Sequence, residues 1–273
     1  MKTKNLFVAI VVFMTILLGF TTCINGNGGG NSFNYSYVSP AIIGYDAQVG
    51  MTLNTYYATL IPDNTSAQSL SSLSPGSCIY MSFDYNSEYQ TSQYYSVASN
   101  ISFQPVDVGV VNSIQEGDTA MVSDYNCPLS SVQLLTDNAG TITSTCPNYG
   151  GRFFIGTFAK LGQNQTLQYY PYIKPDEQLD LNGARNIYLQ AELPGTGELT
   201  GTQDVGTVYA LDMRNILLSS GSDTTIVDGS GTNYSVKYMK INLQYCSSIE
   251  NGSPVFTSVA TQPIYIYAFN DDL

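Results

Sequence analysis

From Ser32 onward the chain follows one pattern that restricts its fold. Short runs of β-forming residues alternate with polar ones, and each run ends in a cluster of Gly, Pro, Asn, Asp or Ser. These clusters recur about every ten residues, which is typical of β-sandwiches and β-barrels. Residues 211–219 form the one modest helix candidate, too short to make a layer. The pattern therefore predicts an all-β fold.

We expect two β-rich modules of the sandwich or barrel type, because about 240 residues suffice for one large or two small domains. The first spans residues 32–107, with strands at 35–43, 51–60, 77–85 and 94–103. The second, a β-sandwich, spans residues 108–273, with strands at 119–125, 132–135, 152–159, 166–173, 186–193, 207–211, 236–245 and 264–269. The last strand is apolar on both faces, which predicts a central core strand or, alternatively, a strand donated to a neighbouring subunit.

The N-terminus has the features of an export signal. Lys2 and Lys4 precede an apolar run that ends at Phe20, and a run of roughly 15 residues fits a signal peptide better than a membrane span. We assign residues 1–22 to the signal peptide and residues 23–31, rich in Gly and Asn, to a flexible tether. An ordinary cleaved signal and an uncleaved anchor are the alternatives.

Cys23 lies where a bacterial lipoprotein carries its acylated cysteine. Residues 19–23 resemble a lipobox, although Phe20 replaces the usual Leu and Thr22 replaces the usual small residue. Relaxed boxes of this kind resemble those of Bacteroidota lipoproteins. The resemblance implies lipidation of Cys23, with palmitate among the acyl chains.

Composition excludes several classes of function. The chain has no His, so a Ser-His-Asp or Cys-His nucleophile and a histidine metal ligand are impossible. Its formal net charge of −12 disfavours nucleic acid as a partner. We predict no cofactor and no metal site, and membrane attachment through the acyl chains alone.

Four further cysteines remain in a chain that we expect to be exported, where disulfides persist. Three connectivities are possible. We favour Cys127 with Cys146, which closes a loop rich in turn residues, and Cys78 with Cys246, each within a strand-like run. A zinc site is the competing use, but the chain has no Cys-x-x-Cys spacing.

Tyrosine is unusually abundant, with 22 residues. Two clusters are candidate carbohydrate platforms, because a tyrosine offers an apolar ring face and a hydroxyl. They consist of Tyr85, Tyr89, Tyr94 and Tyr95, and of Tyr169, Tyr170 and Tyr172. The alternative is that tyrosine suits half-buried sheet surfaces, and the absence of Trp favours that alternative.

Several polar groups are weaker candidates. A glycoside hydrolase needs two carboxyl groups flanking the bond that it cuts, and the acids that cluster are Asp176, Glu177, Asp180, Glu192 and Glu198. Solvated loop charge is the alternative. Asp223 and Asp228 are calcium candidates, with a flexible hairpin as the alternative. Asn-x-Ser/Thr triplets indicate exposed turns and begin at Asn34, Asn64, Asn100, Asn164, Asn233 and Asn251.

A family resemblance covers roughly a quarter of the chain. Its segments are residues 39–45, Gly50, 55–58, 73–78, 83–85 and 94–101. Together they resemble uncharacterised Bacteroidota cell-envelope lipoproteins, which implies a location but no activity. The triplets 118–120 and 223–225 are similar to the O-glycosylation sequon of exported proteins in that phylum.

We therefore expect an exported cell-envelope lipoprotein with a non-catalytic binding or structural role, with carbohydrate or another envelope protein as partner. A filament subunit resembling fimbrillins and a carboxylate-based glycoside hydrolase are the alternatives. Residues 24–30 carry no charge and so lack the acidic surface-export tag of some Bacteroidota lipoproteins. This favours the periplasmic face of the outer membrane over the cell surface.

Overall fold

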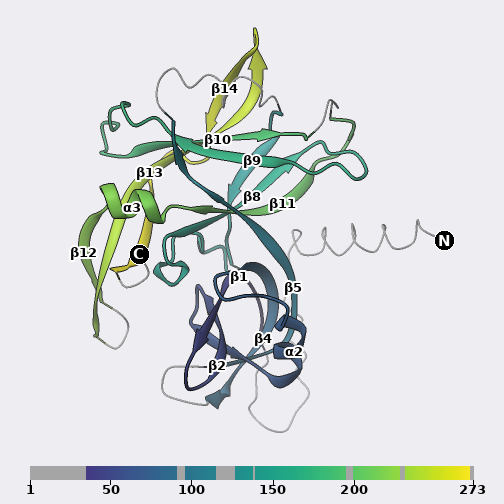
Figure 1. Ribbon diagram of the computed structural model, residues 1–273, viewed down its shortest axis with the longest axis vertical. Coiled ribbons are helices and arrows are strands. Elements are labelled where there is room, and N and C mark those ends of the chain that lie inside the picture. Colours follow the sequence, from purple (N-terminus) through teal and green to yellow (C-terminus); the bar gives the residue numbers. More distant parts are fainter. Residues whose placement is uncertain are drawn as a thin grey trace, which may run out of the picture.

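The computed structural model describes residues 35–90, 96–114, 127–137, 139–194, 199–227 and 231–270 (Figure 1). The expected signal peptide, Cys23, the tether, the strand at 119–125 and the triplet 118–120 lie outside these ranges. So do the candidate residues Asn34, Tyr94, Tyr95, Glu198 and Asp228, and the side chain of Tyr89 is not described either. The described part is all-β, as predicted, with two short α-helices, α2 (Asn64–Leu70) and α3 (Arg214–Ser220).

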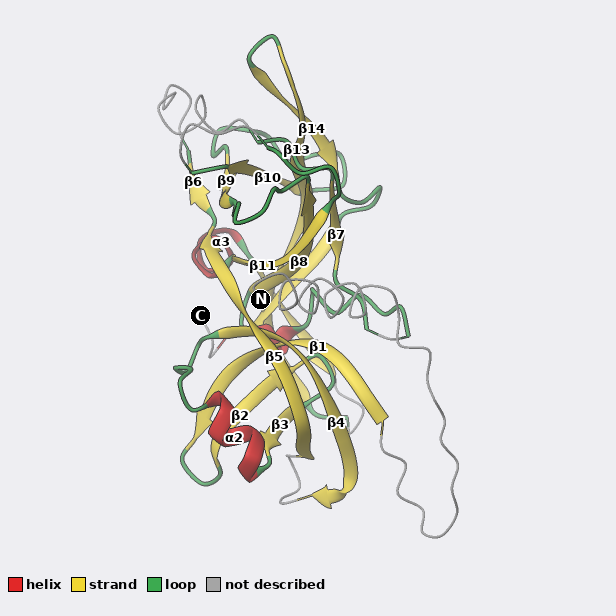
Figure 2. Ribbon diagram, turned by 90° about the vertical axis from the view of Figure 1, so that its right-hand side faces the viewer, coloured by secondary structure: helices red, strands yellow, loops and turns green. Residues whose placement is uncertain are grey.

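The lower lobe in Figure 1 is a closed five-stranded barrel. Its strands are β1 (Tyr35–Asp46), β2 (Gly50–Thr55), β3 (Thr59–Pro62), β4 (Cys78–Gln90) and β5 (Ser96–Val110). They pair in the order β3-β2-β1-β4-β5, and β3 closes the ring by pairing with β5 in parallel. Figure 2 shows α2, which connects β3 to β4, beside the barrel strands, and its Leu70 is buried in the barrel core. This strand order is that of oligonucleotide/oligosaccharide-binding (OB) barrels.

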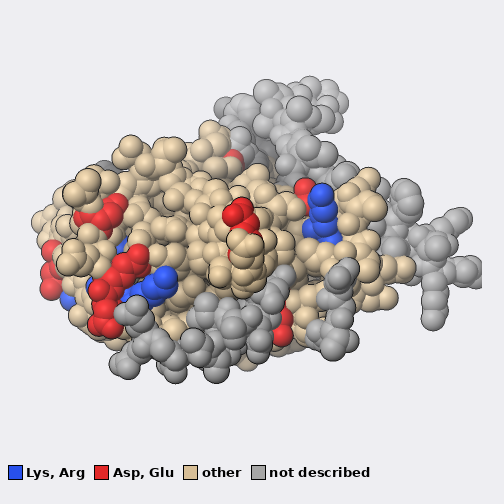
Figure 3. Space-filling view, turned by 90° about the horizontal axis from the view of Figure 1, so that it is seen from above, with Lys and Arg blue, Asp and Glu red and all other residues tan. Residues whose placement is uncertain are grey.

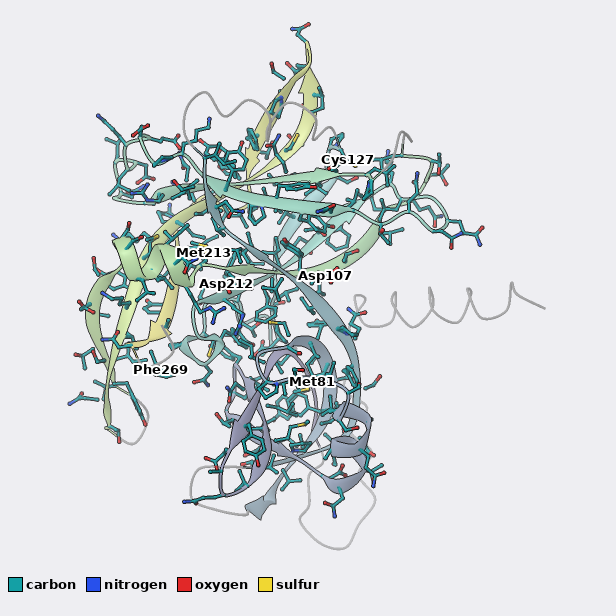
Figure 4. The ribbon with its side chains drawn as sticks, viewed as in Figure 1. Met81, Asp107, Cys127, Asp212, Met213 and Phe269 are labelled. Atoms are coloured by element: carbon teal, nitrogen blue, oxygen red, sulfur yellow. The ribbon has the colours of Figure 1, made fainter. Side chains whose placement is uncertain are left out.

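The apolar side chains on one face of the strand predicted at residues 77–85 fill this barrel. Ile79, Met81 and Phe83 of β4 are buried, and Met81 lies inside the lower lobe in Figure 4. They pack with Leu53 of β2 and Leu60 of β3, which are also fully buried. Alternate residues of each strand thus supply the barrel core, as the period of two requires.

β5 joins the two lobes as one continuous strand. It pairs with β4 up to Val106 and then, from Asp107 to Val110, with β11 (Val205–Asp212). Figure 4 shows Asp107 where the strand leaves the barrel. A Cβ atom on Gly109 would overlap the Tyr209 hydroxyl, so glycine leaves room for the Tyr209 side chain to lie across the paired strands. The predicted module boundary falls inside this strand, where its partner changes, and the division into two modules stays a prediction.

The first sheet continues into the upper lobe. Beyond β11 it adds β8 (Arg152–Ala159) and β7 (Ser131–Leu134), giving eight strands in all. The upper lobe also holds a seven-stranded sheet, whose strands are β6 (Asn112–Ser113), β9 (Gln168–Ile173), β10 (Arg185–Glu192), β12 (Ser222–Val227), β13 (Asn233–Glu250), β14 (Ser253–Ser258) and β15 (Ile264–Phe269).

β13 is the central strand of this second sheet. It is 18 residues long and pairs with β10, β12, β14 and β15. Tyr238 has both Ser222 and Tyr267 as cross-strand partners, so β12 and β15 lie on opposite edges of β13. Ile241 likewise has both Arg185 and Ile264 as partners, so β10 lies on the edge opposite β15.

The largest core cluster lies between the two sheets. Met239, Ile241 and Leu243 of β13 are buried against Phe153 of β8 and Leu211 of β11. Because side chains alternate along a strand, the even-numbered neighbours of these β13 residues point away from this core. The outer face of the second sheet therefore carries Tyr238, Lys240 and Asn242.

Residues 264–269 do not have two buried faces, so this prediction from the sequence was wrong. In β15, Ile264, Ile266 and Ala268 are buried, but Tyr265 is 41% exposed. A tyrosine combines an apolar ring with a polar hydroxyl and is stable on a surface. The strand is therefore amphipathic, and it pairs with β13 of the same chain.

The predicted disulfides were also wrong, because Cys78, Cys127, Cys146 and Cys246 are all buried free thiols. Cys78 and Cys146 belong to a buried apolar cluster at the junction of the two lobes. Cys127 belongs to the sandwich core, and Figure 4 labels it in the upper lobe. The amide of Leu129, near Cys127, donates to the Cys246 carbonyl at 2.9 Å. The topology thus separates the partners that chain order suggested.

The asparagines of the Asn-x-Ser/Thr triplets are exposed where the structure describes them, whereas Ser66 of the Asn64 triplet is buried. Asn100, Asn164 and Asn251 are exposed and adopt positive φ angles of 53°, 65° and 52°, which asparagine tolerates better than most residues. Asn233 begins β13, and Asn64 begins α2 rather than a turn; both are exposed.

We expect the four buried thiols to be unreactive in the folded protein. Burial raises the pKa of Cys78 and Cys127 to about 11 and that of Cys146 to about 12, so each stays protonated at neutral pH. In a Cys23→Ser chain, a thiol reagent such as DTNB should label none of them before unfolding and all four afterwards. A lower count in the unfolded, unreduced chain would reveal a disulfide and contradict this structure.

Candidate functional site

The described members of the two predicted tyrosine clusters take part in packing. The Tyr85 hydroxyl lies 3.1 Å from Ser96 Oγ, and the Tyr169 hydroxyl lies 2.6 Å from Thr157 Oγ1. Tyr170 donates to Glu192 Oε2 at 2.9 Å, and Tyr172 is only 3% exposed. These rings do not form an exposed row, and their role in glycan binding stays a prediction.

The predicted acids anchor a loop, residues 174–184, onto the outer face of the second sheet. Glu177 Oε1 accepts hydrogen bonds from the Tyr188 hydroxyl at 2.8 Å and from Asn186 Nδ2 at 2.9 Å. Asp180 Oδ2 accepts from Asn242 Nδ2 at 2.8 Å, while its Oδ1 accepts from the amides of Asn182 and Ala184. The loop is thereby tied to both β10 and β13.

The electrostatics of Asp180 fit this anchoring role. The hydrogen bond from Asn242 and then the backbone amide of Ala184 lower the pKa of its carboxyl group below the ordinary value. A general acid at neutral pH needs a raised pKa instead. Asp176 is exposed, so the loop acids are arranged as anchors and surface charge.

Three tyrosines form a triangle beside the anchored loop, with Tyr265 exposed and Tyr238 and Tyr267 half-buried. Tyr238 of β13 and Tyr265 and Tyr267 of β15 are each separated from the other two by 6.3 Å between ring centroids. Their rings are close to parallel, with interplanar angles of 15° to 27°. Lys240 Nζ lies 5.6 Å from the Tyr265 ring centroid. We call Tyr238, Tyr265, Tyr267 and Lys240 the tyrosine ladder.

The antiparallel register of β13 and β15 builds the ladder. Tyr238 is the cross-strand partner of Tyr267, and Lys240 is the partner of Tyr265, so the four side chains form two adjacent pairs on one face. Partial burial, together with Tyr265 and Tyr238, raises the pKa of the Tyr267 hydroxyl. That hydroxyl is therefore a hydrogen-bond donor at neutral pH.

A pocket of about 250 Å³ adjoins the ladder. It opens along β13 where β12 pairing has ended at Tyr238 and β10 pairing begins only at Ile241. The pocket is lined by Leu179, Asn182, Gly183, Arg185, Ser220, Ser222, Tyr238, Met239 and Lys240. Lys240 Nζ donates to the Asn182 carbonyl at 3.3 Å, which joins the loop to the ladder. A second depression, of about 460 Å³, shares Arg185 and Ser220 with this pocket.

Charged side chains are sparse around the upper lobe. Figure 3, which views the molecule from above, shows mostly uncharged described surface, with acidic and basic groups close together in places. Asp223, a calcium candidate, pairs with Lys237 at 3.2 Å. No group of three or more metal-ligating side chains occurs within the described ranges.

The ladder was not predicted from the sequence. Residues two positions apart in a strand lie on the same face of the sheet. Tyr265 and Tyr267 have this spacing, and so do Tyr238 and Lys240. The sequence does not reveal that these two segments pair with each other. Their pairing brings the two residue pairs together on one surface.

No protein-family model and no curated protein sequence matches this chain. Solved structures do. An uncharacterised protein from Parabacteroides merdae has a TM-score of 0.54 and 14% identity, over 85% of this chain and 95% of that one. A predicted lipoprotein from Bacteroides fragilis has a TM-score of 0.52 and 11% identity, over 85% and 96%. At these identities the similarity establishes a shared fold, of the barrel-and-sandwich class described above.

No helix within the described ranges is long and apolar enough to cross a bilayer.

Asp180→Asn should loosen the 174–184 loop. An asparagine oxygen is a weaker acceptor than a carboxylate, so the amides of Asn182 and Ala184 should lose hydrogen-exchange protection. In the unsubstituted chain the same protection should begin to fall as the pH drops to the ordinary aspartate pKa, and it should be lost once the pH has passed the lowered folded-state pKa of Asp180. Asp176→Asn, at an exposed position in the same loop, is the matched control. Equal protection in both variants would contradict the anchoring role.

Proposed function

We propose that this chain is a lipid-anchored protein of the cell envelope, at the outer membrane, that binds glycans without catalysis. The signal-like N-terminus and Cys23 support the anchor. The shared fold with a predicted lipoprotein from Bacteroides fragilis is consistent with that location. The absence of charge in residues 24–30 favours the periplasmic face.

The absence of catalysis is inferred from how the polar groups are used. The chain has no His, and Glu177 and Asp180 accept hydrogen bonds that hold a loop in place. Glu192 accepts the Tyr170 hydroxyl. Within the described ranges, the acids that cluster in the sequence are therefore either structural or exposed, which supports a binding role over hydrolysis.

The tyrosine ladder is the observation that carries glycan binding. A sugar ring presents an apolar face of C–H groups, which packs well on an aromatic ring, and hydroxyls that pair with polar side chains. The ladder offers near-parallel rings, phenol hydroxyls and an ammonium group on one partly exposed face. The anchored loop beside it supplies Asn182, and the start of β10 supplies Arg185, as further polar groups.

The anchor is tested by the intact mass of the protein extracted from membranes of its native host. We expect a chain that begins at Cys23 and carries acyl chains. Cys23→Ser should release the protein from the membrane fraction, because one or two acyl chains supply most of the attachment. A lipid-free mature chain that begins after residue 23 would contradict the anchor and indicate simple secretion.

Glycan binding is tested with a glycan array probed by the full exported chain. Replacing both Tyr265 and Tyr267 with Ala should weaken the binding of any glycan bound by at least about fivefold, since two aromatic contacts of about 0.5–1.5 kcal/mol each contribute about 1–3 kcal/mol. Tyr45→Ala is the control, because Tyr45 is 72% exposed and lies on the barrel. Circular dichroism checks that the variants fold. Binding unchanged in the double variant, or no bound glycan at all, would refute the proposal.

A further inference from the structure

Basic residues are few in this protein, and two of them line the pocket beside the ladder. Lys2 and Lys4 belong to the expected signal peptide, which leaves seven basic residues against 21 acidic ones. Arg214 pairs with Asp212, and Lys237 pairs with Asp223. Arg185 and Lys240, both half-buried, line the pocket from opposite faces of the sheet, because Arg185 is paired with the core-facing Ile241 whereas Lys240 points outward.

Neither of these two cations is neutralised by an acidic side chain in the described ranges, where the salt bridges are those of Arg214 and Lys237. Asp180, on the loop beside them, directs its oxygens to Asn242, Asn182 and Ala184. Lys240 donates to the Asn182 carbonyl, which leaves further N–H groups of its ammonium for a ligand. In such an acidic chain, two half-buried cations in one pocket indicate an anionic ligand.

The remaining walls of the pocket suit a sugar. The Tyr238 ring belongs both to the ladder and to the pocket lining, so a glycan lying on the ladder reaches the pocket without a break. Asn182, Ser220 and Ser222 supply groups that pair with hydroxyls. A volume of about 250 Å³ is below the roughly 300–1,000 Å³ of pockets for drug-sized ligands, so it holds about one sugar residue.

We propose that this pocket binds the carboxylate of a single hexuronic acid residue in a glycan whose other residues are neutral and lie on the ladder. The inference rests on the proposed glycan-binding function and names its ligand class. Arg185 and Lys240 bind the carboxylate, and Tyr238 packs against the ring. An isolated uronate is favoured over a dense polyanion, because the net negative charge of the protein repels further carboxylates outside the pocket.

Isothermal titration calorimetry of the full exported chain tests this. One probe is xylotriose carrying one glucuronic acid branch, and the matched probe is the same oligosaccharide with its carboxyl group reduced to the alcohol. We expect the acid to bind at least about tenfold more tightly, since two charge-assisted contacts are lost on reduction. Polygalacturonate, a dense polyanion, should bind more weakly per residue than the single uronate. Raised salt should reduce this difference in affinity, because it screens the repulsion between the polyanion and the acidic protein.

Arg185→Gln and Lys240→Gln should each lower the ratio of the acid's affinity to that of the reduced sugar, because each variant removes one cationic contact to the carboxylate. Arg185→Lys keeps the charge and should retain part of the preference. Lys160→Gln, at an exposed site outside the pocket lining, is the control. Thermal melting verifies that each variant folds.

The outcomes separate the two proposals. Equal binding of the two sugars, or a preference that survives both glutamine variants, overturns the uronate site but leaves glycan binding on the ladder intact. Binding of neither sugar overturns the uronate site, and the glycan array then decides the proposed function. Tighter binding of a peptide with a free C-terminal carboxylate than of the acidic sugar also overturns the uronate site.

Discussion

The pairing of β13 with four other strands is the interaction on which the upper lobe depends. Its edges hold β12 and β10 on one side and β15 and β14 on the other, so one strand fixes the register of most of the second sheet. One face of β13 packs into the sandwich core through Met239, Ile241 and Leu243. The same alternation directs Tyr238 and Lys240 outward, so core packing and the candidate binding surface arise from one register.

The barrel and the sandwich are linked through β5, and this link explains the shape of the molecule. One strand pairs first with β4 and then with β11, so a single hydrogen-bonded sheet passes from one lobe into the other. A cluster that includes Cys78, Cys146 and Tyr149 fills the junction between the lobes. The cysteines serve there as small apolar groups, which free buried cysteines commonly do.

Local patterning was enough to predict strands but not their neighbours. Residues 152–159 and 264–269 coincide with β8 and β15, because alternation and turn residues are properties of the chain itself. The helix candidate at 211–219 corresponds to α3, shifted by a few residues. By contrast, the cysteine pairing and the solvent-facing side of β15 depend on which distant strands meet. The ladder was missed for the same reason, since Tyr238 and Tyr267 are adjacent only through the register of β13 and β15.

The central claim is that the outer face of the second sheet is the ligand-binding surface. Hydrogen–deuterium exchange of the full exported chain, with and without the xylotriose that carries one glucuronic acid, tests it most directly. We expect slower exchange in residues 179–185, 238–240 and 264–267 when the sugar is bound, and no change in the barrel core. Protection confined to the barrel strands, with residues 238–240 unaffected, would contradict the account and place the binding surface on the other lobe.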